Sequence, residues 1–271
     1  MGFYVRVEPD VKIYVEDLNP KGKKAILFLH GWPGSHKLFE YQFNALPQLG
    51  YRCIGIDTRG FGDSDKPYSG YGYDRLSDDL RSVIEALKLN EATLLGHSTG
   101  GSIAVRYMSR HNEYGISKLV LCAAAVPSLI IRQNFPYGLP NDAVNSIIEE
   151  TYRDRPKMLR EFSNMFFYKL TTEALSDWFF QLGLEAAGWA TASIAKTWLG
   201  EEELFSDMGK ISVPTLILHG IHDKVCLFPL AEAQNKGIKN SRLVAFQESG
   251  HGLFYDEHDK FNKELMQFIE E

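Results

Sequence analysis

The sequence is poor in cysteine and contains no long hydrophobic run. Its three cysteines, Cys53, Cys122 and Cys226, form an odd and widely spaced set, which argues against a disulfide framework. No segment approaches the ~18 consecutive apolar residues that cross a bilayer, and the N-terminus lacks the apolar region of a secretory signal. We therefore expect a cytoplasmic protein with reduced, buried thiols and no membrane partner.

Positive charge is also scarce. The chain has 29 Lys and Arg residues against 35 Asp and Glu residues, a formal net charge of -6, so it has no basic field that would attract a phosphate backbone. Close ligand spacings such as Cys-x-x-Cys or His-x-x-x-His are missing, and so is a glycine-rich phosphate loop. We expect no nucleic-acid partner, no metal and no cofactor.

The chain lacks a linker rich in Pro, Gly or Ser, and it has no internal repeat. Hydrophobic residues make up 44% of the sequence, enough for one large core with a small lid. Oligomeric state is left open between a monomer and a homodimer.

Six short apolar runs alternate with longer amphipathic segments. The runs are Ala25 to Leu29, Arg52 to Ile56, Ala92 to Leu95, Lys118 to Cys122, Thr215 to Leu218 and Arg242 to Phe246. Apolar residues recur at helical spacing from Tyr73 to Leu89, from Gly101 to Arg110 and from Lys260 to Ile269. This alternation predicts an α/β fold, in which helices cover both faces of a mostly parallel, twisted sheet.

The stretch from about Pro127 to Ser206 has no strand-like run but is dense in helix formers and aromatic residues. Because it is too long for a connecting loop, we predict a helical cap inserted late in the sheet. The predicted domains are an α/β core of residues 1–126 and 207–271 and a cap of residues 127–206. Such a cap would fold over the carboxyl ends of the strands, where open α/β sheets bind ligands.

Ser98 is the candidate nucleophile. It lies in Gly96-His97-Ser98-Thr99-Gly100, between an apolar run and a helical pattern, which is the strand-turn-helix context of a nucleophile elbow. Gly96 and Gly100 leave room for the sharp turn, and the new helix directs the free Thr99 N–H toward the reacting oxygen. The alternative is a glycine-rich structural turn.

A second loop, His30-Gly31-Trp32-Pro33-Gly34, follows an early apolar run. By position its Trp32 N–H is the second donor of an oxyanion hole, although an ordinary strand-to-helix turn would show the same residues. We expect His30 to brace the loop through hydrogen bonds.

Asp223 and His251 complete the candidate site. Asp223 follows the fifth apolar run, where its carboxylate can accept the Nδ1–H of a histidine; the alternative is a solvated aspartate paired with Lys224. His251 stands between two glycines that give its loop the freedom to aim an imidazole. The chain order Ser98, Asp223, His251 is the one found with a nucleophile elbow, and it predicts His251 as the general base.

These motifs resemble the α/β-hydrolase superfamily over nearly the whole chain. Within it the sequence is similar to a capped group of small-molecule carboxylesterases, non-haem haloperoxidase-like esterases and proline iminopeptidases. The resemblance also includes the stretch from Asp57 to Ser64, which it implies to be structural. Relatives such as haloalkane dehalogenases and epoxide hydrolases have an aspartate where Ser98 stands, so the serine favours acyl transfer.

The expected function is hydrolysis of small-molecule carboxylic esters with small to medium acyl groups. Carbon-carbon bond hydrolysis, lactone hydrolysis and a proline iminopeptidase-like activity are alternatives, although Trp32 stands where proline iminopeptidases usually have a further glycine. A non-catalytic ligand receptor on the same fold is the alternative of another class. The expected substrate-binding residues are Trp32, Phe135, Phe166, Trp178 and Trp189, unless the aromatic residues of the cap form its own core.

Overall fold

The computed structural model describes residues 1–200 and 204–271, and within them the chain forms one eight-stranded sheet. Its strands are β1 (Gly2–Glu8), β2 (Val11–Leu18), β3 (Ala25–Leu29), β4 (Arg52–Ile56), β5 (Ala92–His97), β6 (Ile116–Cys122), β7 (Thr215–Gly220) and β8 (Ser241–Phe246). Their order is β1-β2-β4-β3-β5-β6-β7-β8. Strands β3 to β8 run parallel, whereas β1 and β2 pair antiparallel at one edge.

The six predicted strands correspond to β3 to β8, and the predicted α/β fold with a mostly parallel sheet is confirmed. The β1–β2 hairpin was not predicted. Its residues alternate instead of forming a continuous apolar run: Val11, Ile13 and Val15 are buried while Lys12 is exposed. Alternation of this kind is typical of an antiparallel strand with one solvated face.

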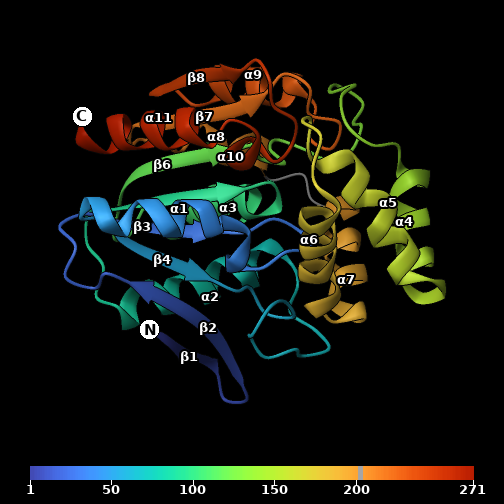
Figure 1. The fold of residues 1–271 in the computed structure, drawn as a ribbon, viewed down its shortest axis with the longest axis horizontal. Coiled ribbons are helices and arrows are strands. Elements are labelled where there is room, and N and C mark those ends of the chain that lie inside the picture. The colour runs from blue at the N-terminus through green and yellow to red at the C-terminus, as the bar shows by residue number, and fades with distance from the viewer. Residues whose placement is uncertain (201–203) are drawn as a thin grey trace.

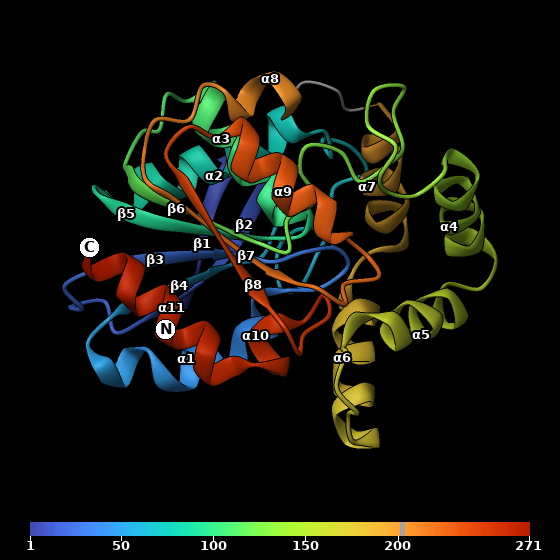
Figure 2. The same ribbon diagram turned by 90° about the horizontal axis from the view of Figure 1, so that it is seen from above.

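Helices cover both faces of the sheet (Figure 2). Helices α2, α3, α8 and α9 lie on one face, and α1, α10 and α11 lie on the other. Outside the cap the helices are η1 (His36–Phe39), α1 (Glu40–Ala45), η2 (Pro47–Leu49), α2 (Tyr73–Ala86), α3 (Thr99–Arg110), α9 (Phe228–Gly237), α10 (Leu253–Asp256) and α11 (His258–Glu270). The three predicted helices correspond to α2, α3 and α11.

A helical insertion joins β6 to β7, as the sequence predicted. It contains α4 (Asn141–Arg153), α5 (Arg155–Phe166), α6 (Glu173–Glu185), α7 (Gly188–Gly200) and α8 (Leu204–Met208). Helices α4 to α7 gather at one end of the sheet, beyond the carboxyl ends of the parallel strands (Figure 1). Helix α8 instead packs on α3, where its Asp207 pairs with Arg106 at 2.9 Å. It therefore straddles the predicted boundary at residue 206.

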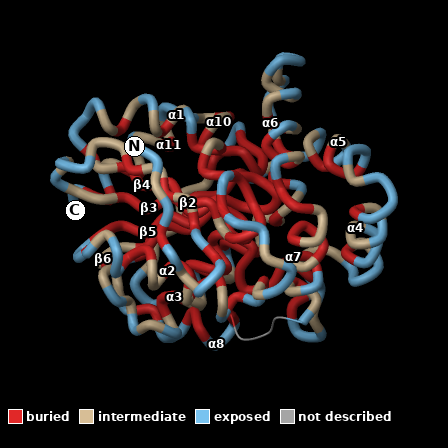
Figure 3. Tube along the Cα trace, turned by 90° about the horizontal axis from the view of Figure 1, so that it is seen from below, coloured by how far each residue is buried: buried red, intermediate tan, exposed pale blue. Residues whose placement is uncertain are grey.

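The core lies between the sheet and its helices, and buried residues concentrate along the central strands (Figure 3). Every residue of β5 is buried, which holds the end of this strand rigidly inside the molecule. The three cysteines are free and buried. Among the described residues, no helix combines the length and the apolar character that a membrane crossing requires.

Candidate active site

Ser98 occupies the single residue between β5 and α3. Its backbone has φ 54° and ψ -123°, a conformation that L side chains rarely adopt and that stores strain at functional sites. This sharp turn lifts the side chain off the strand end. Thr99 then opens α3, whose first N–H groups have no partner within the helix.

Close packing explains the two glycines of the motif. A Cβ on Gly96 would lie 2.5 Å from the Gly100 carbonyl oxygen, and one on Gly100 would lie 2.5 Å from the carbonyl oxygen of Leu29 at the end of β3. Only glycine fits such a close approach between backbone segments. The turn at Ser98 is therefore pressed against the start of the predicted oxyanion loop.

That loop passes directly beside the serine. A Cβ on Gly31 would lie 2.7 Å from the Ser98 Cβ, so the backbone that leads into Trp32 borders the candidate nucleophile. His30 braces the loop as expected: its Nδ1–H donates to the Gly31 carbonyl at 2.9 Å, and its Nε2 accepts from the Thr58 N–H at 3.0 Å. Burial lowers the pKa of His30, which favours the neutral ring that this bonding pattern requires.

Asp223 and His251 form a buried pair. His251 Nδ1 lies 2.8 Å from Asp223 Oδ2, and because a carboxylate only accepts, Nδ1 carries the proton. The other carboxylate oxygen accepts from the N–H groups of Val225 and Cys226 at 2.8 and 2.9 Å. Both carboxylate oxygens of Asp223 thus accept hydrogen bonds inside the protein, and the alternative pairing with Lys224 is not formed.

The environment keeps Asp223 ionised. Burial by itself raises the pKa of the carboxyl, but the neighbouring His251 and His219 outweigh it and hold the pKa well below its usual range. His219 Nε2 lies 3.3 Å from Asp223 Oδ2. This contact depends on how the turn after β7 folds back.

Ser98 and His251, the predicted nucleophile and general base, are not hydrogen-bonded to each other in this structure. Ser98 Oγ instead contacts Cys226 Sγ at 4.0 Å, while His251 Nε2 is buried and has no partner among the described residues. His251 is nevertheless beside the elbow, since its carbonyl accepts from His97 Nε2 at 3.2 Å and the two rings lie 4.6 Å apart. Catalytic hydrogen bonds in ligand-free sites are often long and tighten only with substrate.

Ser98 borders a cavity of about 280 Å³ between the core and the cap. Its walls come from the cap helices α4, α5 and α7 and from the loops after β3, β6 and β7. The lining residues are Trp32, Ser98, Leu129, Leu139, Ala143, Ser146, Ile147, Phe162, Met165, Trp198, Lys224 and Val225. Mostly apolar walls with a few polar groups are typical of small-molecule sites, and the volume is near the lower end of their ~300–1,000 Å³ range.

The cavity lining contains one of the five predicted binding aromatics. Trp32 lines the cavity, but the other four are not among its lining residues. Phe166 packs edge-on against the His251 ring at 5.1 Å, and the Trp189 ring stacks on Tyr68 at 4.6 Å.

Phe135 borders a separate hollow beside Phe205, and Trp178 is a half-buried residue of the cap. Within the cap, Phe166 also packs on Phe162 and Phe179, so part of the aromatic set contributes to the cap's own core, which was the alternative left open by the sequence. The cavity instead receives Phe162 and Trp198, whose rings each lie 5.2 Å from that of Trp32.

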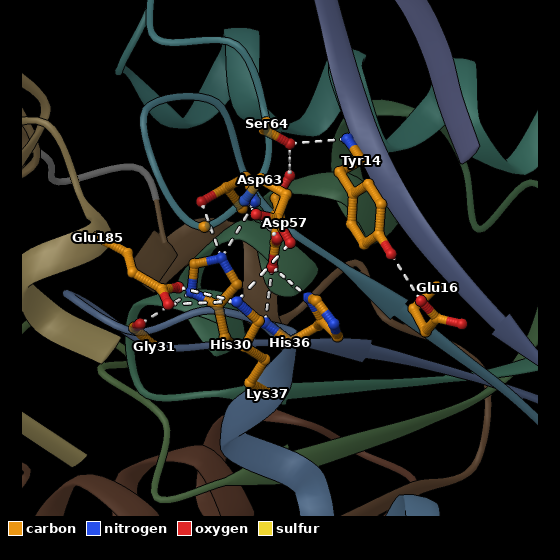
Figure 4. A network of polar contacts seen from close by, with 12 residues as sticks. Tyr14, Glu16, His30, Gly31, His36, Lys37, Asp57, Asp63, Ser64 and Glu185 are labelled. Atoms are coloured by element: carbon orange, nitrogen blue, oxygen red, sulfur yellow. Dashed lines mark hydrogen bonds and ion pairs between the residues drawn. The ribbon is translucent and has the colours of Figure 1, made fainter. Parts of the chain in front are cut away.

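A polar network around Asp57 holds His36, which follows the predicted oxyanion loop in the chain (Figure 4). Asp57 Oδ1 accepts from the His36 N–H at 2.6 Å and from His36 Nδ1 at 2.8 Å, and Oδ2 accepts from the Asp63 N–H at 2.8 Å. Ser64 Oγ donates to the Asp57 carbonyl and accepts from the Tyr14 N–H. The stretch from Asp57 to Ser64 therefore joins β2, β4 and η1.

Three possible metal ligands of this network, on His36, Asp57 and Asp63, lie within 4.8 Å of one another. Their polar atoms already have partners in the chain, and the Lys37 ammonium lies 3.7 Å from Asp63. These contacts give the group a structural role.

A larger hollow of about 660 Å³ lies at the opposite end of the sheet. It is lined by residues at the amino ends of parallel strands, among them Ala25, Arg52 and Thr93. It contains none of the candidate site residues. Ligands of open α/β sheets bind at the carboxyl ends, so the smaller cavity at Ser98 is the candidate site.

Comparisons with known proteins agree with this arrangement. The chain is 45% identical over 270 residues to the AB hydrolase superfamily protein YisY of Bacillus subtilis, covering 99% of both chains. Its fold is similar to that of the esterase EaEST from Exiguobacterium antarcticum, with 43% identity, a TM-score of 0.96 and complete coverage of both chains. A bromoperoxidase from Bacillus anthracis matches with 30% identity and a TM-score of 0.94, again over both whole chains. A family model described as alpha/beta hydrolase fold matches residues 24–258, and the chain therefore belongs to the α/β-hydrolase family.

Proposed function

We propose that this protein is a serine hydrolase that cleaves carboxylic esters of small to medium acyl groups through an acyl-enzyme intermediate. The observation that carries the proposal is the strained backbone of Ser98, at φ 54°, on the wall of an apolar cavity next to the buried His251–Asp223 pair. A strained residue beside a base that is itself oriented by a carboxylate is the arrangement that activates a serine.

In the proposed mechanism a rotation about χ1 turns the Ser98 hydroxyl from Cys226 to the free Nε2 of His251. His251 takes the proton as Ser98 attacks the ester carbonyl, and Asp223 stabilises the imidazolium that forms. The N–H groups of Trp32 and Thr99 hold the developing oxyanion, each contributing about 3 kcal/mol. His251 then protonates the leaving alcohol and activates the water that releases the acid.

Two observations favour ester hydrolysis over the alternatives: the similarity to a known esterase and the residues that line the cavity. The esterase EaEST matches over its full length at 43% identity. Among the described residues that line the cavity there is no carboxylate to hold a substrate amine, which disfavours a proline iminopeptidase-like activity. Lactone hydrolysis and a receptor role without turnover remain as outcomes of the test, and carbon-carbon bond hydrolysis remains an alternative.

Perhydrolysis is a second candidate, favoured by one relative. The chain is 28% identical over 98% of its length to a bifunctional esterase/perhydrolase of Acinetobacter calcoaceticus. In this reaction hydrogen peroxide replaces water in the second step, so that the acyl group leaves Ser98 as a peracid and the serine hydroxyl is restored. Peracid release from an ester in the presence of peroxide would distinguish it from simple hydrolysis.

The test compares wild type with Ser98→Ala on p-nitrophenyl esters of increasing acyl length, on lactones and on prolyl amides. We expect ester turnover by wild type, a loss of at least about 1,000-fold in Ser98→Ala, and a mass increase of one acyl group on Ser98 in trapped enzyme. Ser146→Ala, on the exposed rim of the same cavity, is the matched control and retains activity. Near wild-type turnover by Ser98→Ala would refute the mechanism, and a burst without steady turnover would favour the receptor.

A further inference from the structure

Lys224 is the one charged side chain among the described residues that line the Ser98 cavity. Its side chain is exposed, and so are those of Ser146 and Met165 on the same lining. These three residues therefore mark the rim, where the apolar interior meets solvent. A cation at such a rim faces whatever part of a bound molecule extends out of the cavity.

The backbone that presents Lys224 is held in place on both sides. Val225 and Cys226 donate their N–H groups to Asp223 Oδ1, so the residues after Lys224 are anchored to the candidate catalytic acid. On the other side, the His222 ring stacks on Tyr168 at 3.9 Å with the planes 8° apart. The position of the Lys224 Cα relative to the site is thereby determined by the same contacts that build the site.

The ammonium of Lys224 forms no ion pair with the described residues. The carboxylate beside it in the sequence, Asp223, is buried and engaged with His251 and His219. Elsewhere exposed lysines do pair, as Lys24 does with Glu270 and Lys169 does with Glu248. Lys224 thus offers, at the cavity mouth, a positive charge that no carboxylate of the described residues pairs with, in a protein whose net charge is -6.

We propose that Lys224 is a specificity-determining residue that selects esters with a carboxylate at the end of the acyl chain remote from the scissile bond, that is, half-esters of dicarboxylic acids. This inference rests on the proposed ester hydrolysis. The apolar walls take the methylene chain, the ester group lies at Ser98, and the free carboxylate reaches the rim, where it stays partly hydrated and meets the ammonium. Pairing at an exposed rim avoids the desolvation that a buried ion pair requires.

The experiment measures kcat and KM for monomethyl adipate and for its uncharged counterpart methyl hexanoate. Lys224→Met removes the charge and keeps an apolar stem of similar length. We expect the KM for monomethyl adipate to rise about three- to tenfold, while kcat and both constants for methyl hexanoate stay within about twofold. Lys224→Arg should retain the preference, and Lys224→Glu should weaken binding of the half-ester further.

Lys239→Met is the matched control, because Lys239 is also exposed but lies outside the cavity lining. This variant should leave kcat and KM unchanged for both esters. Raising the salt concentration from about 0.02 to 0.5 M should reduce the preference of the wild type for monomethyl adipate over methyl hexanoate, since salt screens exposed charges. An equal loss of kcat/KM for both esters in Lys224→Met, or an unchanged KM for monomethyl adipate, would overturn the assignment of Lys224 and leave the proposed function intact. A wild type that hydrolyses neither ester, nor any nitrophenyl ester, would overturn both.

Discussion

The hydroxyl of Ser98 contacts the thiol of Cys226 at 4.0 Å, while the ring nitrogen that would activate it, His251 Nε2, has no partner among the described residues. In the proposed mechanism the Ser98 side chain therefore leaves one neighbour before it reaches the other. Cys226 is buried, and burial raises the pKa of its thiol well above the ordinary value, so the thiol stays protonated at neutral pH. The contact is that of two neutral groups and is weak.

Substitution of Cys226 should tune activity through this contact. We expect Cys226→Ser to lower kcat about three- to tenfold, because a hydroxyl is a stronger partner for Ser98 by about 1 kcal/mol. Cys226→Ala should keep kcat within about threefold of wild type. Steady-state kinetics on a p-nitrophenyl ester check this, with Cys53→Ser in β4 as a control at a buried cysteine that does not contact Ser98. A loss above about a hundredfold in Cys226→Ala would mean that the thiol takes part in the chemistry.

Gly31→Ala should damage catalysis more than binding. Its Cβ would lie 2.7 Å from the Ser98 Cβ, so the loop must shift and carry the Trp32 N–H away from the oxyanion. We expect kcat to fall about a hundredfold, the usual cost of one oxyanion donor. Gly34→Ala on the same loop is the control, because its nearest contact would be 3.4 Å away. Equal kcat values for the two variants would contradict the assignment of this loop.

Trp198 should limit the length of the acyl chain. It lines the cavity beside Trp32, so Trp198→Phe opens space there with only a moderate change in packing. We expect kcat/KM for octanoyl relative to acetyl p-nitrophenyl esters to rise about three- to tenfold. Trp189→Phe, whose indole stacks on Tyr68, should leave that ratio unchanged. The same shift in both variants would show that the change is not local to the cavity.

Asp57 should stabilise the fold in a pH-dependent way. Burial alone raises the pKa of its carboxyl, but hydrogen bonding and charge from His36 lower it below the ordinary value. A carboxyl with a lowered pKa in the folded state contributes stability above its unfolded pKa of about 3.9, and this stability is lost as the pH falls through the folded value.

We therefore expect Asp57→Asn to lower the free energy of unfolding by about 1–3 kcal/mol at pH 7, and the difference from wild type should shrink below about pH 4. Urea unfolding between these pH values measures it. Asp63→Asn is the matched control: its side chain is half exposed and lies 3.7 Å from the Lys37 ammonium, so the expected change is below about 1 kcal/mol. A difference that stays constant down to acid pH would count against an ionised Asp57.

The sequence by itself determined the features that depend on neighbours along the chain. Strands β3 to β8 follow from short apolar runs, and helices α2, α3 and α11 follow from helical spacing. The strained turn at Ser98 depends on glycines two residues away on each side, so its motif was visible before any coordinates. The hairpin of β1 and β2 was missed because alternating residues at a sheet edge carry a weaker signal than a buried run.

Only the tertiary structure decided which side chains meet. Phe166 and Trp198 are both cap aromatics in the sequence, yet one packs against His251 and the other lines the cavity. Likewise the sequence pointed to His251 as the neighbour of Ser98, whereas the hydroxyl contacts Cys226, 128 residues away. A helix presents an aromatic side chain to its own core or to a ligand according to how it docks on distant elements, and side-chain rotamers follow from that packing. Neither the docking of the helix nor the side-chain rotamer can be predicted from the local sequence.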